Sequence, residues 1–344
     1  MFFIAIIIFL LLLIYFSKQN NSKRSASASV PINKNIQPVK NSNITNKEKP
    51  IIVNYVGQTI FLNWASEKTI MSNSCYPKYF YSNYGIIDCN TFHNDMIKKG
   101  FLEKANLEKS LSTKTLVELK EILQKNNLKK SGNKPEIIRR IIDNIDPEKI
   151  EVENEIYILS EKGKEYIAKY QYILDIKDTS ISVEEFEKER EVLSPEFSNR
   201  DVIWAIYNKY CLKLFYEKNF GLYRNNFFEM ALFLDEEKRY KESLEHYLKV
   251  LCCDLSGMGN DNVIEEKSML FLAPGVIKKV LKLKNFFSKE IALRAYKTTT
   301  LPFNYCNEMI FLKIVDEIMK GTGETEIFNK YLSKMKEKPT TEIL

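Results

Sequence analysis

The hydrophobic pattern starts with an unbroken apolar run at residues 2–16, FFIAIIIFLLLLIYF. At about 1.5 Å per residue this run is short for a hydrocarbon core of roughly 30 Å, so it needs Ser17 and a snorkelling Lys18 to span one. A cleaved signal peptide is the alternative, with a cleavage-like triplet of small residues at 26–28. Because no Lys or Arg precedes the run, we expect a retained transmembrane anchor over residues 1–17.

The flanks of the apolar run predict its orientation. Lys18, Lys23 and Arg24 all follow the run, and the positive-inside rule keeps such a flank in the cytoplasm. We therefore expect a single-pass membrane protein that meets the membrane through its N-terminal helix and holds most of its chain in the cytoplasm. Secretion after cleavage of a signal peptide is the alternative localisation.

Residues 51–105 combine short apolar runs with a helical pattern over 91–99 that ends at Gly100. Aromatic side chains are frequent here, and we expect most of them to form the core of a small module. They are Tyr55, Phe61, Trp64, Tyr76, Tyr79, Phe80, Tyr81, Tyr84 and Phe92.

Residues 111–145 show two amphipathic helical patterns joined by a basic loop. Ser112 or Thr113 is expected to cap the first helix, and Asn127 to end it, because Asn tolerates a left-handed backbone. Pro135 opens the second helix, where its missing N–H costs little. Apolar residues recur at helical spacing, namely Leu116, Leu119, Ile122 and Leu123 in the first helix and Ile137, Ile138, Ile141, Ile142 and Ile145 in the second.

This stretch resembles the SAP domain, a helix–extended loop–helix module associated with DNA binding. The family pattern has a Leu-Lys pair in the first helix, a Gly-Leu pair at its end, a Ser-Gly-x-Lys loop and an Ile/Leu-x-Arg in the second helix. Asn127-Leu128 departs from the usual Gly-Leu, a mild change given the backbone tolerance of Asn. The remaining positions match at Leu119, Lys120, Ser131, Gly132, Lys134, Ile138 and Arg140.

Residues 151–200 are expected to connect two folded parts. The run IYIL at 156–159 predicts a short strand, and Ser160 is placed to cap the next helix, although Gly163 weakens its start. Helical patterns dominate from residue 201 onward, with Asp201 as the expected first cap. The helices are expected at 202–215, 227–237, 240–254, 275–284, 288–296, 305–320 and 324–336.

The segment at about 224–255 resembles one tetratricopeptide (TPR) hairpin. Two departures stand out, because Leu255 replaces the usual Pro and no second repeat follows at a period of about 34 residues. The resemblance implies a helical domain over 201–338 that could bind a protein partner. The matching positions are Phe227, Met230, Ala231 and Leu234 in one helix and Ser243, Tyr247 and Val250 in the other.

Charge is unevenly distributed along the 344 residues. The chain has 51 Lys+Arg and 45 Asp+Glu, a net charge of +6. Residues 18–50, rich in Asn, Ser and Lys, contain seven positive residues and one negative, which equals the whole surplus. We expect a flexible basic linker there, since this composition cannot bury a core. The remaining 44 positive and 44 negative residues cancel, so any anion-binding site after residue 50 must depend on local clustering.

Residues 111–145 supply such a cluster, with eight positive and four negative residues. Together with the SAP resemblance, this predicts weak, salt-sensitive and largely sequence-independent DNA binding, on the order of three to five phosphates. The expected DNA-binding residues are Lys120, Lys129, Lys130, Ser131, Gly132, Lys134, Arg139 and Arg140.

Candidate catalytic chemistry is sparse. The chain has eleven Gly and lacks both a phosphate-binding P-loop and a dinucleotide-binding fingerprint. Its two His, His93 and His246, lie far apart, and its six Cys show no metal or disulfide spacing. We therefore expect no enzymatic activity, no cofactor and no metal.

These observations predict a mainly α-helical fold with an N-terminal transmembrane anchor. The leading function is a membrane-tethered cytoplasmic accessory protein that binds DNA through a SAP-like domain. The alternative is a non-enzymatic scaffold for protein–protein interaction that uses the C-terminal helical domain. The expected parts are an anchor (1–17), a linker (18–50), an aromatic module (51–105), a SAP-like helix–loop–helix (106–150), a connecting segment (151–200) and a TPR-like domain (201–338).

Overall fold

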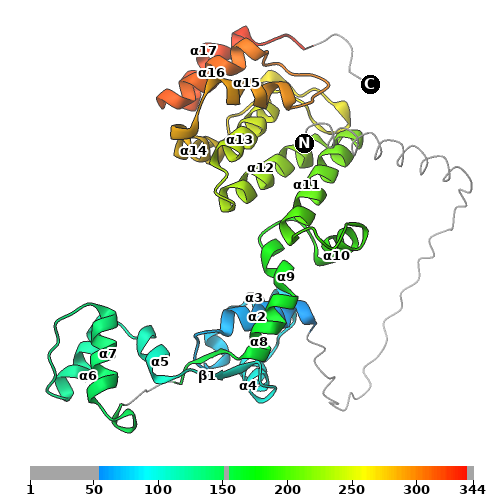
Figure 1. Ribbon diagram of the computed structural model, residues 1–344. Coiled ribbons are helices and arrows are strands. Elements are labelled where there is room, and N and C mark those ends of the chain that lie inside the picture. Colours follow the sequence, from blue (N-terminus) through cyan, green and yellow to red (C-terminus); the bar gives the residue numbers. More distant parts are fainter. Residues whose placement is uncertain (1–53, 151–154, 339–344) are drawn as a thin grey trace, which may run out of the picture. The chain divides into compact units, whose positions relative to one another are not determined.

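The computed structural model describes residues 54–150 and 155–338, which are mainly helical (Figure 1). Three hydrophobic clusters organise these residues. The first part of the chain forms α2 (Tyr55–Ala65), α3 (Tyr79–Tyr84), α4 (Cys89–Lys98), β1 (Leu102–Lys104), α5 (Leu107–Thr113), α6 (Leu116–Lys125), α7 (Lys134–Asn144), β2 (Tyr157–Leu159), α8 (Glu161–Lys169) and α9 (Gln171–Ile176). The second part forms α10 (Val183–Val192), α11 (Asn199–Tyr216), α12 (Phe220–Glu236), α13 (Tyr240–Asp254), α14 (Pro274–Lys282), α15 (Lys289–Thr298), α16 (Glu308–Lys320) and α17 (Glu324–Tyr331).

Short 3-10 turns complete the secondary structure. They are η1 (Asn73–Cys75), η2 (Pro147–Lys149), η3 (Asn260–Asn262), η4 (Lys267–Met269), η5 (Lys284–Phe286) and η6 (Leu332–Lys334).

The predicted membrane anchor at 1–17 and linker at 18–50 lie outside the described residues. Within 54–150 and 155–338, no helix is both long enough and apolar enough to cross a bilayer. The 18-residue helix α11, for example, carries Arg200, Asp201, Lys209 and Lys213. The structure therefore corrects two predictions. The fold class is mainly helical without a transmembrane element in this part of the chain, and single-pass membrane localisation has no support from the described residues.

A first cluster is built around aromatic residues of α2, α3 and α4, with Phe61 at its centre. The Phe61 ring lies 5.0 Å from that of Phe80 and 4.8 Å from that of Phe92, centroid to centroid. As the sequence predicted, most aromatics of this segment are buried or half-buried, although Tyr79 and Tyr81 are exposed. We call the unit formed by α2–α4, β1, β2, α8 and α9 the aromatic unit.

An antiparallel two-stranded ribbon holds the aromatic unit together across a long gap in sequence. Leu102 of β1 lies opposite Leu159 of β2, and Lys104 lies opposite Tyr157. Lys68 adds an isolated bridge to Tyr157 on its other side. The predicted IYIL strand is thus real, whereas its three-residue partner β1 has no alternating pattern long enough to be recognised. Residues 105–156, which include α5–α7, are consequently an insertion between two paired strands.

The start of α8 is fixed by close backbone packing. Ser160 caps the helix as predicted, because its Oγ accepts from the Gly163 N–H at 3.1 Å and donates to the Gly100 carbonyl at 2.6 Å. Gly163 is buried, and a Cβ added there would overlap the carbonyl oxygen of Phe101. That same oxygen accepts from the Ser160 N–H at 3.1 Å. Glycine at this position therefore allows the helix to approach the ribbon.

His93 lies fully buried in the aromatic unit. Its Nδ1 is 3.0 Å from the Tyr76 hydroxyl, which also accepts from the Met71 N–H. The hydroxyl and Nδ1 share a hydrogen bond whose donor depends on the tautomer of the ring. Among the described residues, Nε2 has no hydrogen-bond partner. Burial lowers the pKa of His93 to about 4, so the ring is neutral at physiological pH.

This neutral histidine predicts that acidification destabilises the fold. Between the folded pKa of about 4 and the ordinary value of 6.5, the unfolded chain binds more protons than the folded chain. The free energy of unfolding should therefore rise with pH through this window, by up to about 3 kcal/mol from His93, and level off above it. Urea unfolding at pH 5 and pH 7 measures the difference, which lies above the range where most carboxylates titrate.

The matched variant is His93→Gln, which keeps an acceptor for Tyr76. His246 also has a pKa lowered to about 4, chiefly by burial. A His246→Gln variant therefore separates its contribution to the pH dependence of the unfolding free energy from that of His93. Wild-type and His93→Gln proteins with the same change in unfolding free energy between pH 5 and pH 7 would contradict the prediction.

The largest cluster joins the end of α9 to η6 and includes α10–α17. Ser198, rather than the predicted Asp201, caps α11, and the Asp201 carboxylate accepts from the Ser198 N–H in a reciprocal capping box. The expected hairpin is formed by α12 and α13. Its turn is closed by Asp235, which accepts from Ser243 Oγ at 2.6 Å and from the Tyr247 hydroxyl at 2.9 Å. We call α10–α17 with their connecting turns the C-terminal body.

Candidate nucleic-acid interface

The inserted helices form a small module with its own core. Leu111, Leu119, Leu123, Ile137 and Ile141 are fully buried in it. They come from α5, α6 and α7, and the predicted pair of helices therefore has a third helix before it. We call residues 105–150 with this core the inserted module.

The first predicted helix begins later than expected because α5 occupies the preceding residues. Ser112 and Thr113 belong to α5, and Thr115 caps α6 instead. Thr115 Oγ1 accepts from the Glu118 N–H at 3.3 Å, and the Glu118 carboxylate accepts from the Thr115 N–H at 2.6 Å. Hydrogen bonds from Thr115 lower the pKa of the Glu118 carboxyl, so an acidic group stays ionised at this end of α6.

The end of α6 follows the sequence prediction. Asn127 adopts a left-handed conformation with φ of 57°, and the Leu128 N–H donates to the Leu123 carbonyl at 2.8 Å. Leu128 packs back against the core of the inserted module. The chain then leaves α6 in a fixed direction and enters the basic loop.

Arg140 holds the basic loop in place. Its Nη1 donates to the carbonyl of Lys129 at 2.6 Å and to that of Ser131 at 2.8 Å. Gly132, between these carbonyls and α7, has φ of 130°, which disfavours any other residue. The sequence predicts Arg140 to contact DNA, whereas the structure shows its guanidinium engaged with the backbone of the loop.

The opening of α7 offers few free N–H groups to an anion. Asn133 caps the helix by accepting from the Glu136 N–H at 3.1 Å, and the Glu136 carboxylate accepts from the Asn133 N–H at 3.1 Å. Two of the first amides are therefore occupied, and Pro135 has none. A negative side chain also lies at this helix terminus, where it competes with an incoming phosphate.

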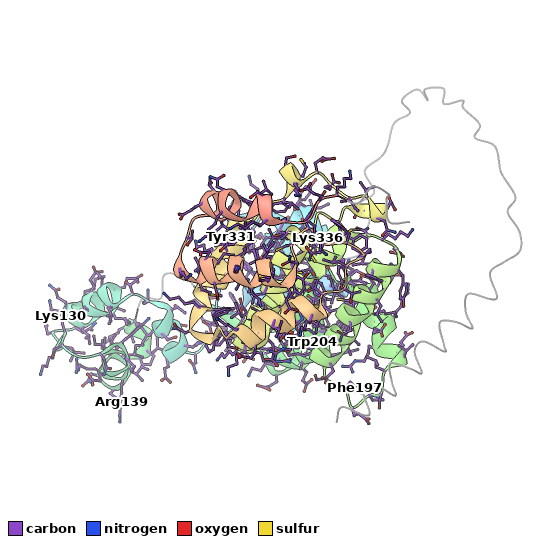
Figure 2. The ribbon with its side chains drawn as sticks, turned by 90° about the horizontal axis from the view of Figure 1, so that it is seen from above. Lys130, Arg139, Phe197, Trp204, Tyr331 and Lys336 are labelled. Carbon is purple, nitrogen blue, oxygen red and sulfur yellow. The ribbon has the colours of Figure 1, made fainter. Side chains whose placement is uncertain are left out.

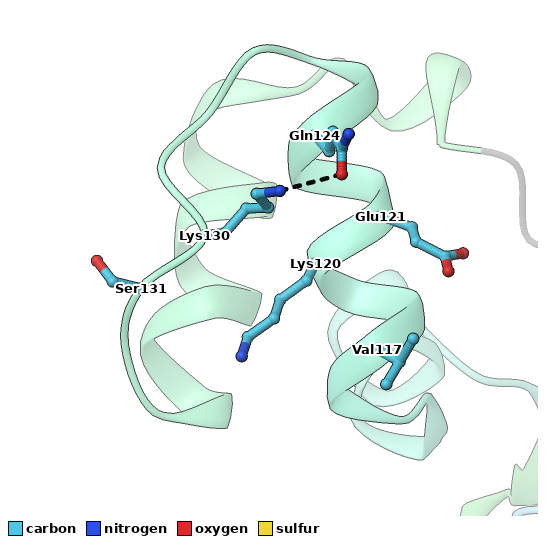
Figure 3. A pocket seen from close by; sticks show the side chains of 6 residues that line it. All are labelled: Val117, Lys120, Glu121, Gln124, Lys130 and Ser131. Carbon is cyan, nitrogen blue, oxygen red and sulfur yellow. Dashed lines mark hydrogen bonds between the residues drawn. The ribbon is translucent and has the colours of Figure 1, made fainter.

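Two lysine side chains, Lys120 and Lys130, line a shallow groove between α6 and the basic loop (Figure 3). Lys120 extends from α6 on the side of the loop, whereas Glu121 points away from it. Lys130 Nζ donates to Gln124 Oε1 at 3.1 Å, a contact that the sequence did not predict. Lys120, Lys129 and Lys130 are exposed, and Lys134 is half-exposed at the start of α7.

Arg139 lies apart from these lysines. It is 85% exposed and its Nε is 3.5 Å from the Asp143 carboxylate on the next turn of α7. Figure 2 labels Lys130 and Arg139 and shows them at different edges of the inserted module. The structure thus gathers Lys120, Lys129, Lys130 and Lys134 with Ser131 and Gly132 around one loop, assigns Arg140 a supporting contact and leaves Arg139 on another face. We call Lys120, Lys129, Lys130 and Lys134 the loop lysines.

The described residues offer few candidate metal ligands or reactive nucleophiles. In 54–150 and 155–338, no group of three or more His, Cys, Asp or Glu side chains could hold a metal ion. Burial raises the pKa of the Cys252 thiol to about 12, which disfavours a reactive thiolate. The absence of enzymatic activity stays a prediction.

Comparison with known proteins identifies the inserted module. Residues 110–146 match the family model of the SAP domain, which confirms the resemblance read from the sequence. The match covers a small part of the 344-residue chain. No curated protein and no solved structure matches the chain. The TPR-like resemblance of α12 and α13 has no support from these comparisons and stays a prediction.

Proposed function

We propose that this protein binds duplex DNA through the loop lysines of its SAP domain, by contacts with phosphates rather than bases. The observation that carries the proposal is the pair of hydrogen bonds from Arg140 to the loop carbonyls. These bonds fix a lysine-rich loop, in a module that matches a DNA-binding family, without using the lysine ammonium groups. Lys129 and Lys130 are then presented to solvent from a fixed backbone.

The chemistry of the loop lysines supports weak and largely sequence-independent binding. A lysine ammonium is a point charge that binds phosphate without the two-pronged geometry by which Arg reads guanine. Four lysines correspond to about four phosphates, so the logarithm of the binding constant should fall with the logarithm of salt concentration with a slope of roughly −3.5. Strong binding only at low salt is therefore expected.

The decisive variant combines Lys129→Glu, Lys130→Glu and Lys134→Glu in the full chain. We expect its affinity for a duplex of about 20 base pairs to fall at least about tenfold at low salt, with a salt slope shallower by two to three, because three phosphate contacts become repulsive. Fluorescence anisotropy at two salt concentrations and a gel shift measure both quantities. Arg140 is left unchanged, because its loss would disturb the loop.

A matched control combines Lys213→Glu, Lys313→Glu and Lys336→Glu, three exposed lysines of the C-terminal body. It produces the same change in net charge at other places. If both triple variants lose affinity equally, net charge explains the binding and the loop lysines have no special role. Unchanged affinity in the loop variant would refute the proposal.

The second candidate function, a protein-interaction scaffold, is supported by an apolar surface on the C-terminal body. A cavity of about 460 Å³ there is lined by Met258, Met269, Phe271 and Leu301, among others. Met269 is 65% exposed and Phe271 is 51% exposed. If the full chain fails to bind DNA at low salt, the scaffold function is tested instead. Replacing Met269 and Phe271 by Asp should then weaken the binding of a protein partner.

A further inference from the structure

A second basic surface lies on the C-terminal body, far along the chain from the SAP domain. Residues 274–289 read PGVIKKVLKLKNFFSK and contain five lysines without a single Asp or Glu. This is unexpected in a chain whose charges balance after residue 50. The stretch forms α14, η5 and the start of α15 (Figure 1).

The helical geometry of α14 places its lysines opposite its apolar residues. Val276 and Val280 are buried against the C-terminal body, whereas Lys278 and Lys282 are exposed. Lys278 and Lys282 are one turn apart, so their positions on the axis differ by about 6 Å. Lys279 lies at the edge of this face, where its Nζ is 3.8 Å from the Asp235 carboxylate. The outward face of α14 is therefore basic from Lys278 to the end of the helix.

The turn after α14 carries a further exposed lysine. The Phe286 ring lies 5.1 Å from the Tyr240 ring of α13, at an interplanar angle of 34°. The Phe286 N–H donates to the Leu283 carbonyl at 2.9 Å, which tightens η5 directly after the helix. These contacts anchor the exposed Lys284 next to the end of α14. We call Lys278, Lys282 and Lys284 the α14 lysines.

We propose that the α14 lysines form a second contact surface for the phosphate backbone of duplex DNA. The proposal rests on the proposed function for its choice of ligand, but it depends on a separate surface. Lys278 and Lys282 lie on one face of α14, so their flexible ammonium groups can reach neighbouring phosphates of the same strand. Two contact surfaces on one chain raise the local concentration of DNA at each.

The composition of the outward face favours a polyanion in water over a membrane. A helix that lies in a membrane interface inserts an apolar face between lipids. In α14 that face is already used, because Val276, Val280 and Leu283 are buried in the C-terminal body. The exposed residues of α14 are Pro274, Gly275, Lys278 and Lys282, which supply charge without a large apolar side chain. The exposed aromatic of the following turn, Phe286, packs against Tyr240. An acidic peptide and an anionic vesicle are kept as explicit outcomes of the test.

The experiment uses the full chain with Lys278→Glu, Lys282→Glu and Lys284→Glu combined. Lys279 is left in place because it pairs with Asp235. We expect duplex affinity to fall about tenfold at low salt and the salt slope to become shallower by two to three. The Lys213, Lys313 and Lys336 triple variant, in the same body, should bind as the wild type does.

A neutral variant guards against a folding artefact. Because Lys282 lies in the last turn of α14, charge reversal there also opposes the helix dipole. The triple Lys→Gln variant removes the phosphate contacts with less disturbance, and it should retain the wild-type melting temperature while losing part of the affinity. An affinity equal to that of the wild type in both the Glu and the Gln variants overturns the inference.

The same titrations separate this inference from the proposed function. Loss in the loop-lysine variant with no change in the α14 variant overturns the inference alone. Loss in the α14 variant with no change in the loop-lysine variant overturns the proposed function alone. If the α14 variant keeps its DNA affinity but loses binding to phosphatidylserine vesicles or to polyglutamate, the surface belongs to that partner and the inference is wrong.

Discussion

Replacing residues 106–155 by an Asn-Gly turn should remove the SAP domain and leave the aromatic unit folded. Lys104 pairs with Tyr157, and the Ala105 N–H donates to the Ile156 carbonyl at 2.8 Å, so Ala105 and Ile156 already face each other. A two-residue Asn-Gly loop closes such an antiparallel pair with the twist that the strands require. The ion pair of Lys104 with Glu155 is lost, but both side chains are more than half exposed and such pairs contribute little.

The excised protein should unfold cooperatively, with a melting temperature within a few degrees of the wild-type value, and should bind DNA more weakly than the triple loop variant. Circular dichroism and the anisotropy titration measure the two properties. The control joins Phe101 to Ser160 through the same turn and so removes both strands. Because Leu102 belongs to the core of the aromatic unit, that control should be unfolded or molten there. Equal behaviour of the two deletions would show that the ribbon does not support the unit.

Gly163→Ala should be among the most destabilising single substitutions in the chain, with a loss of about 3 kcal/mol or more of unfolding free energy. The new methyl group would overlap the Phe101 carbonyl oxygen, which is backbone and cannot rotate away. Moving that oxygen breaks its hydrogen bond from the Ser160 N–H. It also displaces the Phe101 ring from Tyr166, 5.2 Å away.

Urea unfolding of the full chain measures this loss. Gly275→Ala is the matched control, because a Cβ at that helical position meets nothing within 4 Å. It should be neutral or slightly stabilising, since Ala restricts the unfolded chain more than Gly does. A Gly163→Ala protein as stable as the Gly275→Ala protein would mean that α8 can shift away from the ribbon without cost.

Local rules predicted the elements that depend on neighbouring residues. Asn127 ends α6 in the left-handed conformation, and Ser160 caps α8, because both effects act within a few residues. Where two caps competed, the prediction chose Ser112 or Thr113 and missed Thr115, since α5 is too short to show a clear period. The SAP match itself depends on closely spaced residues and could be read from the sequence.

Contacts between distant residues could not be predicted from one sequence. The sequence pattern predicts 51–105 and 151–200 as separate parts, whereas Leu102 and Ile173 share one core in the structure. From the sequence, Gly163 only weakens the start of a helix. The requirement for glycine follows from the Phe101 carbonyl oxygen, which lies beside it in the fold and leaves no room for a Cβ. In the site, a charge count cannot distinguish Arg140, which bonds the loop carbonyls, from lysines that face solvent.

Insertion of the SAP domain between β1 and β2 also has a consequence for the order of folding. Pairing these strands requires closing a loop of residues 105–156, which costs roughly 3–4 kcal/mol of chain entropy for a flexible segment of that length. The contacts within α5–α7 are local and form quickly by comparison. Once the SAP domain is folded, much of the loop is already compact and the remaining closure costs less. Folding of the inserted domain before the strands pair therefore lowers the entropy cost of closing this loop, relative to an unfolded loop of the same length.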